Sequence, residues 1–320
     1  MAGITELGTT YNLPNYTGML HQLTPSDTPF FSAIGGLTGG GQTNSIEFEW
    51  QTFDLRAAAQ NAKLEGADAP TGQERVRANV DNIVQIHHET VEVSYTKLAA
   101  VQAKSGINNA QSNPVTNEAD WQIEQMLKQM VRDIEFSFLQ GTYQKPVDNT
   151  TARKTRGLLE AITTNVIAVD AGAGAPGPLT EDMILDLLQS IWDNGGIQES
   201  DTATIIANSF QKRQLTKIFI TDKNYEEGSR TVGGVRVQTI ETDFGTLNIM
   251  LDRHMPASSL AVASLEQCMP VYQEIPGKGH FFAEPLARTG AKDRTQLYGE
   301  VGLNYGNQRT HGKITNLTTS

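Results

Sequence analysis

The sequence predicts an α+β protein built from a long β-hairpin, a long amphipathic helix and an inserted α/β block. Apolar and polar residues alternate over residues 46–51 and again over 91–96, which is the pattern of half-buried strands. Over residues 117–140, apolar residues recur every three or four positions, as on one face of a helix. Helical and strand patterns alternate between residues 178 and 252, which indicates a mixed α/β unit.

Residues 1–45 predict an extended N-terminal arm. They show no sustained helical or strand period and end in a glycine-rich run, residues 35–41, which we expect to be flexible. Up to residue 46 the chain carries Glu6 and Asp27 but no Lys or Arg, so this is not a polybasic arm for nucleic acid. The apolar anchors scattered along the arm are Leu13, Leu20, Leu23, Phe30, Phe31 and Ile34.

Residues 46–96 predict an extended hairpin whose tip cannot form a core of its own. Residues 56–79, between the strands, offer mostly alanine as apolar surface. A segment of this length without its own secondary structure is functional or disordered, so we expect it to complete its packing on another molecule. The apolar phase changes between Ile86 and Val91, which predicts a bulge at residues 87–89.

Charged residues on this hairpin are candidates for pairing with a neighbouring subunit. A projecting loop has few partners in its own chain, whereas a solvated surface charge contributes little, and both interpretations stay open. The residues concerned are Lys63, Glu65, Arg75 and Arg77.

The helix over 117–140 has clear start and stop signals. Asn117 is the expected N-cap, acidic Glu118 and Asp120 suit the first turn, and Gly141 follows the last residue. At about 1.5 Å per residue such a helix is about 36 Å long, enough to form the backbone of a domain.

The inserted block begins with a helix capped by Thr180 and ended by residues 194–196. Further elements follow in a regular order. We expect a strand at 204–207, a helix at 209–219, strands at 235–240 and 247–251 joined by a turn at 243–245, and returning strands at 260–263 and 297–305.

Two glycine patterns could indicate nucleotide binding. Residues 172–177 spell G-x-G-x-x-G after an apolar run, but Pro176 and a helix start near Thr180 favour a flexible linker instead. Residues 36–43 match a phosphate loop except that Gln42 stands where a lysine must reach the phosphates, so we interpret this run as a hinge.

The histidines do not form a metal or catalytic motif. His87 and His88 are adjacent in a strand and point to opposite faces, so they cannot bind one metal together. Residues 252–254, Asp-Arg-His, are expected to form a hydrogen-bonded strand end. We therefore expect no catalytic residue, no cofactor and no metal.

Composition limits the classes that remain. The chain has 320 residues, a net charge of -11 and one cysteine, Cys268, so neither an intrachain disulfide nor a four-thiolate zinc site can form. Charged residues make up only 19%, which agrees with extensive burial between subunits. The sequence has no apolar run of about 18 residues and no secretion signal, so we expect neither a membrane span nor export.

The ordered set of segments resembles the major capsid protein of tailed bacteriophages, with the Hong Kong 97-type fold. The resemblance covers nearly the whole chain, and the order of its motifs carries it. These motifs are residues 24–30 (TPSDTPF), 49–52 (EWQT), 61–68 (NAKLEGAD), 132–135 (RDIE), 192–196 (WDNGG), 243–245 (DFG), 252–256 (DRHMP), 285–290 (PLARTG) and 311–312 (HG).

The resemblance implies a shell protein with five regions. They are an N-terminal arm (1–45), an extended loop (46–96), a peripheral domain with its spine helix (97–177), an axial domain (178–252) and returning peripheral strands with the C-terminus (253–320). It implies pentamers and hexamers around double-stranded DNA held by weak non-specific contact. Further implied partners are portal, scaffold and possibly decoration proteins, with assembly in the host cytoplasm and a final place in the virion.

The same fold implies candidate intersubunit contacts and leaves alternatives open. Besides the loop residues Lys63, Glu65, Arg75 and Arg77, the arm residues Phe30 and Phe31 are expected to touch a neighbouring subunit. The alternatives are an encapsulin-like compartment shell, a nucleotide-dependent enzyme using residues 172–177, and a phage tail or decoration protein.

Overall fold

The computed structural model describes residues 22–99, 115, 117–197, 203–221, 228–232 and 235–319. The chain forms two compact units. The first comprises Met1–Asp27, His88–Val131 and Phe282–Tyr298, and the second comprises Thr28–His87, Arg132–Phe281 and Gly299–Ser320.

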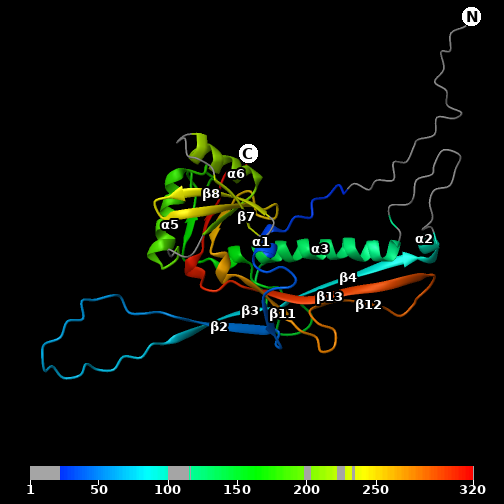
Figure 1. The fold of residues 1–320 in the computed structure, drawn as a ribbon, viewed down its shortest axis with the longest axis horizontal. Coiled ribbons are helices and arrows are strands. Elements are labelled where there is room, and N and C mark those ends of the chain that lie inside the picture. The colour runs from blue at the N-terminus through cyan, green and yellow to red at the C-terminus, as the bar shows by residue number, and fades with distance from the viewer. Residues whose placement is uncertain are drawn as a thin grey trace, which may run out of the picture. The chain divides into compact units, whose positions relative to one another are not determined.

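The hairpin is a two-stranded antiparallel ribbon of β2 (Glu47–Phe53) and β3 (Arg77–Ile83). Its register runs from the pair Glu47 and Ile83 to the pair Phe53 and Arg77, and both strands are labelled in Figure 1. A hairpin is present, but its returning strand is β3. Residues 91–96, which the alternating pattern predicted as that strand, lie instead in the next strand, Gln85–Ser94, and in a short helix, Tyr95–Ala99.

The predicted bulge at 87–89 is wrong, because the interruption lies at Val84. There β3 ends, and β4 (Gln85–Ser94) leaves the ribbon to pair with another strand, β13 (Lys292–Asn304). Ile83 and Val84 are both fully buried, so two consecutive side chains enter the core where the strand changes sheets.

The predicted spine helix is confirmed as α3 (Glu118–Gln140), which Figure 1 shows as one continuous helix. The Asn117 side chain accepts a hydrogen bond from the Ala119 backbone nitrogen at 3.1 Å, as an N-cap does. At its other end a Cβ on Gly141 would lie 2.3 Å from the Ser137 carbonyl oxygen, so only glycine fits there.

A seven-stranded sheet forms the core of the inserted block. Its strand order is β5-β14-β10-β6-β9-β8-β7. Three of these strands come from outside residues 178–252, so the sheet extends beyond the range expected for the axial domain. The bounds are β5 (Val166–Ala168), β6 (Thr204–Ala207), β7 (Gly228–Val232), β8 (Val235–Thr242), β9 (Gly245–Leu251), β10 (Leu260–Ala263) and β14 (Gly312–Thr315).

Two helices of this block follow the predicted positions. Helix α5 (Glu181–Asp193) is capped by the Thr180 hydroxyl, and α6 (Ser209–Thr216) continues as a π-helix (Lys217–Thr221). One face of α5 packs on the sheet in a shared core, to which Ile184, Leu187, Leu188, Ile191, Ile205, Val262 and Ile314 all contribute.

A five-stranded sheet has the order β1-β11-β13-β12, with β4 also paired to β13. Its remaining strands are β1 (Gly41–Thr43), β11 (Met269–Gln273) and β12 (Phe281–Pro285). Within the first unit, Glu92 of β4 forms ion pairs with Lys292 and Arg294 of β13.

Part of the predicted arm is ordered structure, which corrects the expectation of an extended segment. Residues Pro29–Ala33 form a one-turn helix, α1, and β1 pairs in parallel with β11. The glycine run between them is not a free hinge, because a Cβ on Gly40 would lie 2.2 Å from the Pro270 carbonyl oxygen. The predicted anchors Leu13 and Leu20 lie outside the described residues.

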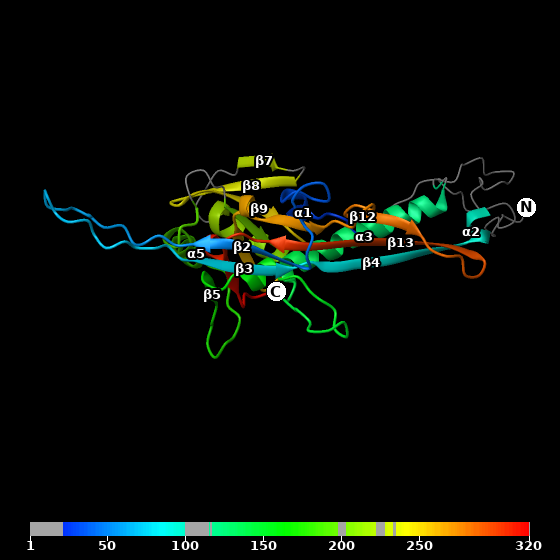
Figure 2. The ribbon, with the colours of Figure 1, turned by 90° about the horizontal axis from the view of Figure 1, so that it is seen from below.

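The remaining elements are short. They are α2 (Tyr95–Ala99), α4 (Leu158–Ala161) and 3₁₀ turns at Leu265–Gln267 and Gln308–Thr310. Among the helices of the described part, none has both the length and the apolar content to span a membrane. Figure 2 shows two loops, one leading into α4 and one following β5, that project on the side of the second unit nearest the C-terminus.

Candidate assembly interface

The loop of residues 54–76 exposes apolar side chains that its own chain does not cover. Every residue in it is exposed, and Figure 1 shows it extending beyond the paired part of the ribbon. Leu55, Leu64 and Val76 are 69%, 86% and 83% exposed. Leu55 and Val76 lie near the base of the loop and Leu64 at its tip, so the loop offers uncovered apolar side chains at both places for contact with another molecule.

The tip of this loop is a defined turn. The Ala67 backbone nitrogen donates a hydrogen bond to the Leu64 carbonyl oxygen at 3.2 Å, and Gly66 has φ +75°. A positive φ at the third position of a four-residue turn is typical of a type II turn and favours glycine. The turn therefore fixes the backbone of residues 64–67, and Lys63 directly precedes it.

Trp50 fixes the ribbon to residues 305–306 of the same unit. Its indole nitrogen donates a hydrogen bond to the Gly306 carbonyl oxygen at 2.7 Å. Its ring meets Tyr305 edge-on with centroids 4.9 Å apart and stacks on Phe48 at 6.0 Å. The apolar face of β2 is therefore satisfied within its own chain, unlike the loop beyond it.

Asn82 fixes the other strand of the ribbon. Its fully buried side chain donates to the Leu303 carbonyl oxygen at 2.6 Å and to the Arg156 carbonyl oxygen at 3.2 Å. It also accepts from the Arg156 backbone nitrogen at 2.9 Å. These bonds join three segments that are distant in sequence, so the direction of the hairpin is set by its base.

A second contact at the base involves Tyr143. Its hydroxyl donates to an Asp81 carboxylate oxygen at 2.7 Å, and the Arg156 guanidinium lies 4.1 Å from its ring centroid. Burial together with the neighbouring Asp81 carboxylate raises the pKa of Tyr143 to about 12. The phenol therefore keeps its proton and acts as a hydrogen-bond donor at neutral pH.

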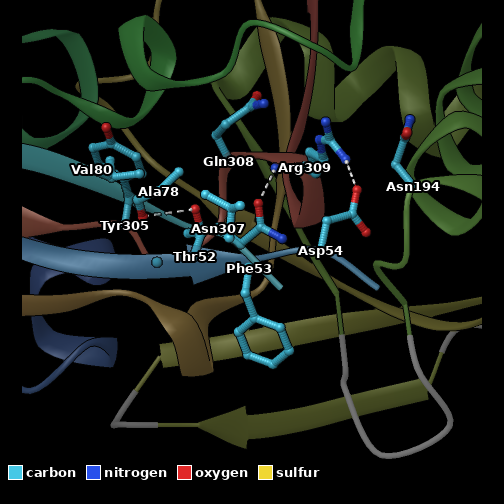
Figure 3. A pocket seen from close by; sticks show the side chains of 12 residues that line it. Thr52, Phe53, Asp54, Ala78, Val80, Asn194, Tyr305, Asn307, Gln308 and Arg309 are labelled. Carbon is cyan, nitrogen blue, oxygen red and sulfur yellow. Dashed lines mark hydrogen bonds and ion pairs between the residues drawn. The ribbon is translucent and has the colours of Figure 1, made fainter. Parts of the chain in front are cut away.

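A pocket opens beside this base, as Figure 3 shows. Its apolar residues come from the ends of β2 and β3. At its edge Asp54 and Arg309 form an ion pair with 3.5 Å between carboxylate oxygen and guanidinium nitrogen. The pocket is lined by Thr52, Phe53, Asp54, Val76, Ala78, Val80, Asn194, Tyr305, Gly306, Asn307, Gln308 and Arg309.

Phe30 and Phe31 of α1 are buried in their own chain, which differs from the expectation that they contact another subunit. They are 0% and 1% exposed, and the Phe31 ring meets Phe138 of α3 edge-on at 5.7 Å. Their backbone nitrogens donate to the two carboxyl oxygens of Glu135 at 2.8 and 2.6 Å. Both side chains therefore belong to the core of their own chain, and the exposed loop residues are the remaining candidates for intersubunit contact.

Glu135 is a buried carboxyl group that the sequence analysis did not identify. Burial, together with the neighbouring Asp252 carboxyl, raises its pKa well above the ordinary value, and the two backbone donors only partly oppose this. The signal in the sequence was an acidic residue beside Ile134 on the apolar face of the helix.

The sequence predicted Asp252 to end a strand with hydrogen bonds, which is confirmed. Asp252 Oδ1 accepts from the His254 backbone nitrogen at 2.7 Å, and Gln140 donates to the His254 carbonyl oxygen.

The glycine patterns do not form nucleotide sites. Asp170 Oδ1 accepts from the backbone nitrogens of Gly172 and Gly174, both at 2.8 Å, so the chain's own carboxylate occupies donors that a phosphate would need. Gln42 contacts His280 at 2.9 Å and lies in a strand.

His87 and His311 are buried and neutral. Burial lowers the pKa of each to about 4. His311 Nδ1 accepts from the Ser264 backbone nitrogen at 3.2 Å, and its Nε2 faces the Tyr305 carbonyl oxygen at 2.7 Å. His88, the neighbour of His87, is exposed, as the strand alternation predicted.

The charged loop residues named from the sequence are exposed. Lys63, Glu65, Arg75 and Arg77 all lie on the loop or at the first residue of β3, and the structure does not bring them together. Within the described ranges, no group of three His, Cys, Asp or Glu side chains is arranged to hold a metal ion.

The ribbon, the long helix and the two sheets together define the Hong Kong 97-type capsid fold. The chain aligns with a capsid protein of cyanophage A-1(L) at TM-score 0.64 and 11% identity, covering 96% of this chain and 97% of that one. The capsid protein of phage XM1 gives 0.61 and 15%, covering 98% and 100%. An encapsulin complex from Synechococcus elongatus gives 0.61 and 11%, covering 96% and 94%.

The family is established by sequence. Residues 3–318 match the SU10 major capsid protein family, and the chain belongs to that family. A major capsid protein of Escherichia phage Phieco32 is 30% identical over 128 residues, which are 40% of this chain and 32% of the relative. The matched segment thus spans about a third of that relative's length.

Proposed function

We propose that many copies of this protein assemble into pentamers and hexamers and form the closed icosahedral head that encloses phage double-stranded DNA. The observation that carries the proposal is the loop of residues 54–76, which exposes Leu55, Leu64 and Val76 on a rigidly fixed ribbon. Individually weak contacts of such loops become strong in a shell, because each later contact forms within an already tethered assembly.

The loop charges belong to this interface. All four are exposed: Lys63 and Glu65 lie at the tip of the loop, and Arg75 and Arg77 lie where the loop joins β3. Charge pairs at the rim of an interface fix register and exclude wrong partners more than they add affinity. We therefore assign them to intersubunit pairing.

The net charge of -11 supports weak, non-specific contact with the enclosed DNA. Further partners in this proposal are a portal, a scaffold and decoration proteins, with assembly in the host cytoplasm. The protein acts as a structural component of the virion and not as an enzyme.

An encapsulin-like compartment is the second candidate, supported by the fold shared with the Synechococcus elongatus complex. Expression of this protein together with a packaging portal and motor distinguishes a phage head from a compartment shell. A phage head fills with nuclease-protected DNA, whereas a compartment shell fills with a protein cargo and no genome.

Shortening the loop tests the proposal. Replacement of residues 57–75 by a four-residue turn leaves β2 and β3 in register, so the variant should keep its circular dichroism spectrum. It should form no shells in negative-stain micrographs at concentrations where the unchanged protein does. Intact shells from the shortened protein would contradict the role given to the loop.

A further inference from the structure

We propose that the loop tip of one copy docks into the pocket at the hairpin base of the next copy. Leu64 enters the pocket, Lys63 pairs with Asp54, and Glu65 pairs with Arg309. The inference rests on the proposed function, since it names the partner surface for the same loop.

The pocket has the chemistry to receive one apolar side chain. Its volume is about 410 Å³, and its lining includes the apolar side chains of Phe53, Val76, Ala78 and Val80. Phe53 is 66% exposed and Val76, at the other strand end, is 83% exposed, so both gain cover from an occupant. Burying an exposed leucine of this kind removes surface from water on both partners.

The tip has the matching shape. Leu64 opens the turn closed by the Ala67 nitrogen, and Gly66 supplies the positive φ that the turn needs. A Cβ on Gly66 would meet nothing within 4 Å, so its role is confined to the backbone conformation. A preformed turn loses little conformational freedom on docking.

The charges are complementary in order. In the tip, the apolar Leu64 stands between a cation, Lys63, and an anion, Glu65. The pocket has an anion, Asp54, and a cation, Arg309, at its edge. The intrachain pair between Asp54 and Arg309 is long, and its side chains are 83% and 51% exposed. Such a pair contributes little, so both groups can exchange partners when the tip arrives.

The contact joins the loop tip of one copy to a different surface, the pocket, of the next copy, so it is head-to-tail. A head-to-tail contact between identical copies generates rings when the rotation closes. From Phe53 to Leu64 the chain advances 11 residues, which is about 36 Å when extended. The tip therefore lies far from the base of its own ribbon and is available to the next copy, as rings of five or six require.

A charge exchange tests the pairing without depending on stability. The double variant Lys63→Glu with Glu65→Lys should raise the concentration needed for shell formation about tenfold or more. Adding Asp54→Lys and Arg309→Glu should restore shells, because the order of charges is reversed on both sides. Arg56→Glu with Asp68→Lys, on the same loop outside the contact, is the matched control and should leave assembly unchanged.

Disulfide trapping tests the position of the tip. Leu64→Cys combined with Ala78→Cys should give chains linked head to tail, seen on non-reducing gels of assembled particles as ladders ending at five and six copies. The native Cys268 is buried and does not compete. Leu64→Cys with Val147→Cys, which pairs the tip with an exposed position outside the pocket, is the control and should stay monomeric on the gel.

Three results would overturn the inference while leaving the proposed function standing. They are shells that form normally with the exchanged tip charges, no recovery in the four-residue variant, and particles in which position 78 links to a segment other than the tip. Failure of the unchanged protein to form shells at all would instead remove the proposed function.

Discussion

Asn82→Ala is the substitution for which the structure gives the largest and best-defined cost at the hairpin base. The side chain is fully buried and makes four hydrogen bonds: two with the backbone of Arg156, one to the Leu303 carbonyl oxygen and one from the Ile83 backbone nitrogen. Each bond contributes about 1 kcal/mol, and each buried backbone group left without a partner costs about 1–3 kcal/mol. We expect a loss of about 3–5 kcal/mol in the free energy of unfolding.

The assay is urea unfolding of the unassembled protein, followed by fluorescence of the tryptophans, one of which is Trp50 in the ribbon. Asn79→Ala is the matched control, because Asn79 is exposed on the same strand and its side chain bonds only to Glu49 at 3.1 Å. We expect the control to cost less than about 1 kcal/mol. Equal effects of the two substitutions would refute the view that the base is held by the Asn82 bonds.

Three further outcomes follow from the geometry and the pKa shifts. Gly141→Ala should lower the melting temperature by several degrees in differential scanning calorimetry, because its Cβ would lie 2.3 Å from the Ser137 carbonyl oxygen; an unchanged temperature would contradict this. The pKa of His87 in the folded protein is about 4, below its ordinary 6.5, so its contribution to stability is present above pH 6.5 and is lost as the pH falls toward 4. His87→Leu should therefore make the free energy of unfolding depend less on pH between pH 4 and 7, and an unaltered pH dependence would refute this. The pKa of Glu135 is raised in the folded protein, so its contribution to stability is full below pH 4.5 and is lost as the pH rises above that value. Glu135→Gln should remove this loss of stability, and the free energy of unfolding measured from pH 5 to 9 would reveal the difference.

The elements that sequence reasoning found are those with a long, regular pattern. Helix α3 and the ribbon each repeat one period over many residues, and α5 carries both a cap at Thr180 and a stop at Gly195. In each case the periodicity is local, so no knowledge of distant partners was needed.

The elements that were missed depend on contacts between distant residues. Helix α1 has five residues, too few to be stable alone, and it forms because Glu135, more than a hundred residues away, accepts its first backbone nitrogens. Strand β14 of the seven-stranded sheet was also missed. It has four residues and is defined by its pairing with β10 and with β5.

The candidate interface could be predicted only in part, because its pocket also depends on contacts between distant residues. The loop and its charges were visible because a long segment without large apolar residues is conspicuous. The pocket was not, because it combines the ends of β2 and β3 with Asn194 and residues 305–309, which only folding brings together. Phe30 and Phe31 were expected to contact a neighbouring subunit, because no nearby residue in the sequence indicated the core that covers them.

The change of sheet at Val84 has a mechanical consequence. A pull on the tip runs along both strands of the ribbon in the same direction, so it does not separate them one pair at a time. The load passes instead to the buried Ile83 and Val84 and to the Asn82 side chain. In a shell held together by such ribbons, internal pressure would first break the contacts of these three residues. The hydrogen bonds between β2 and β3 would stay intact.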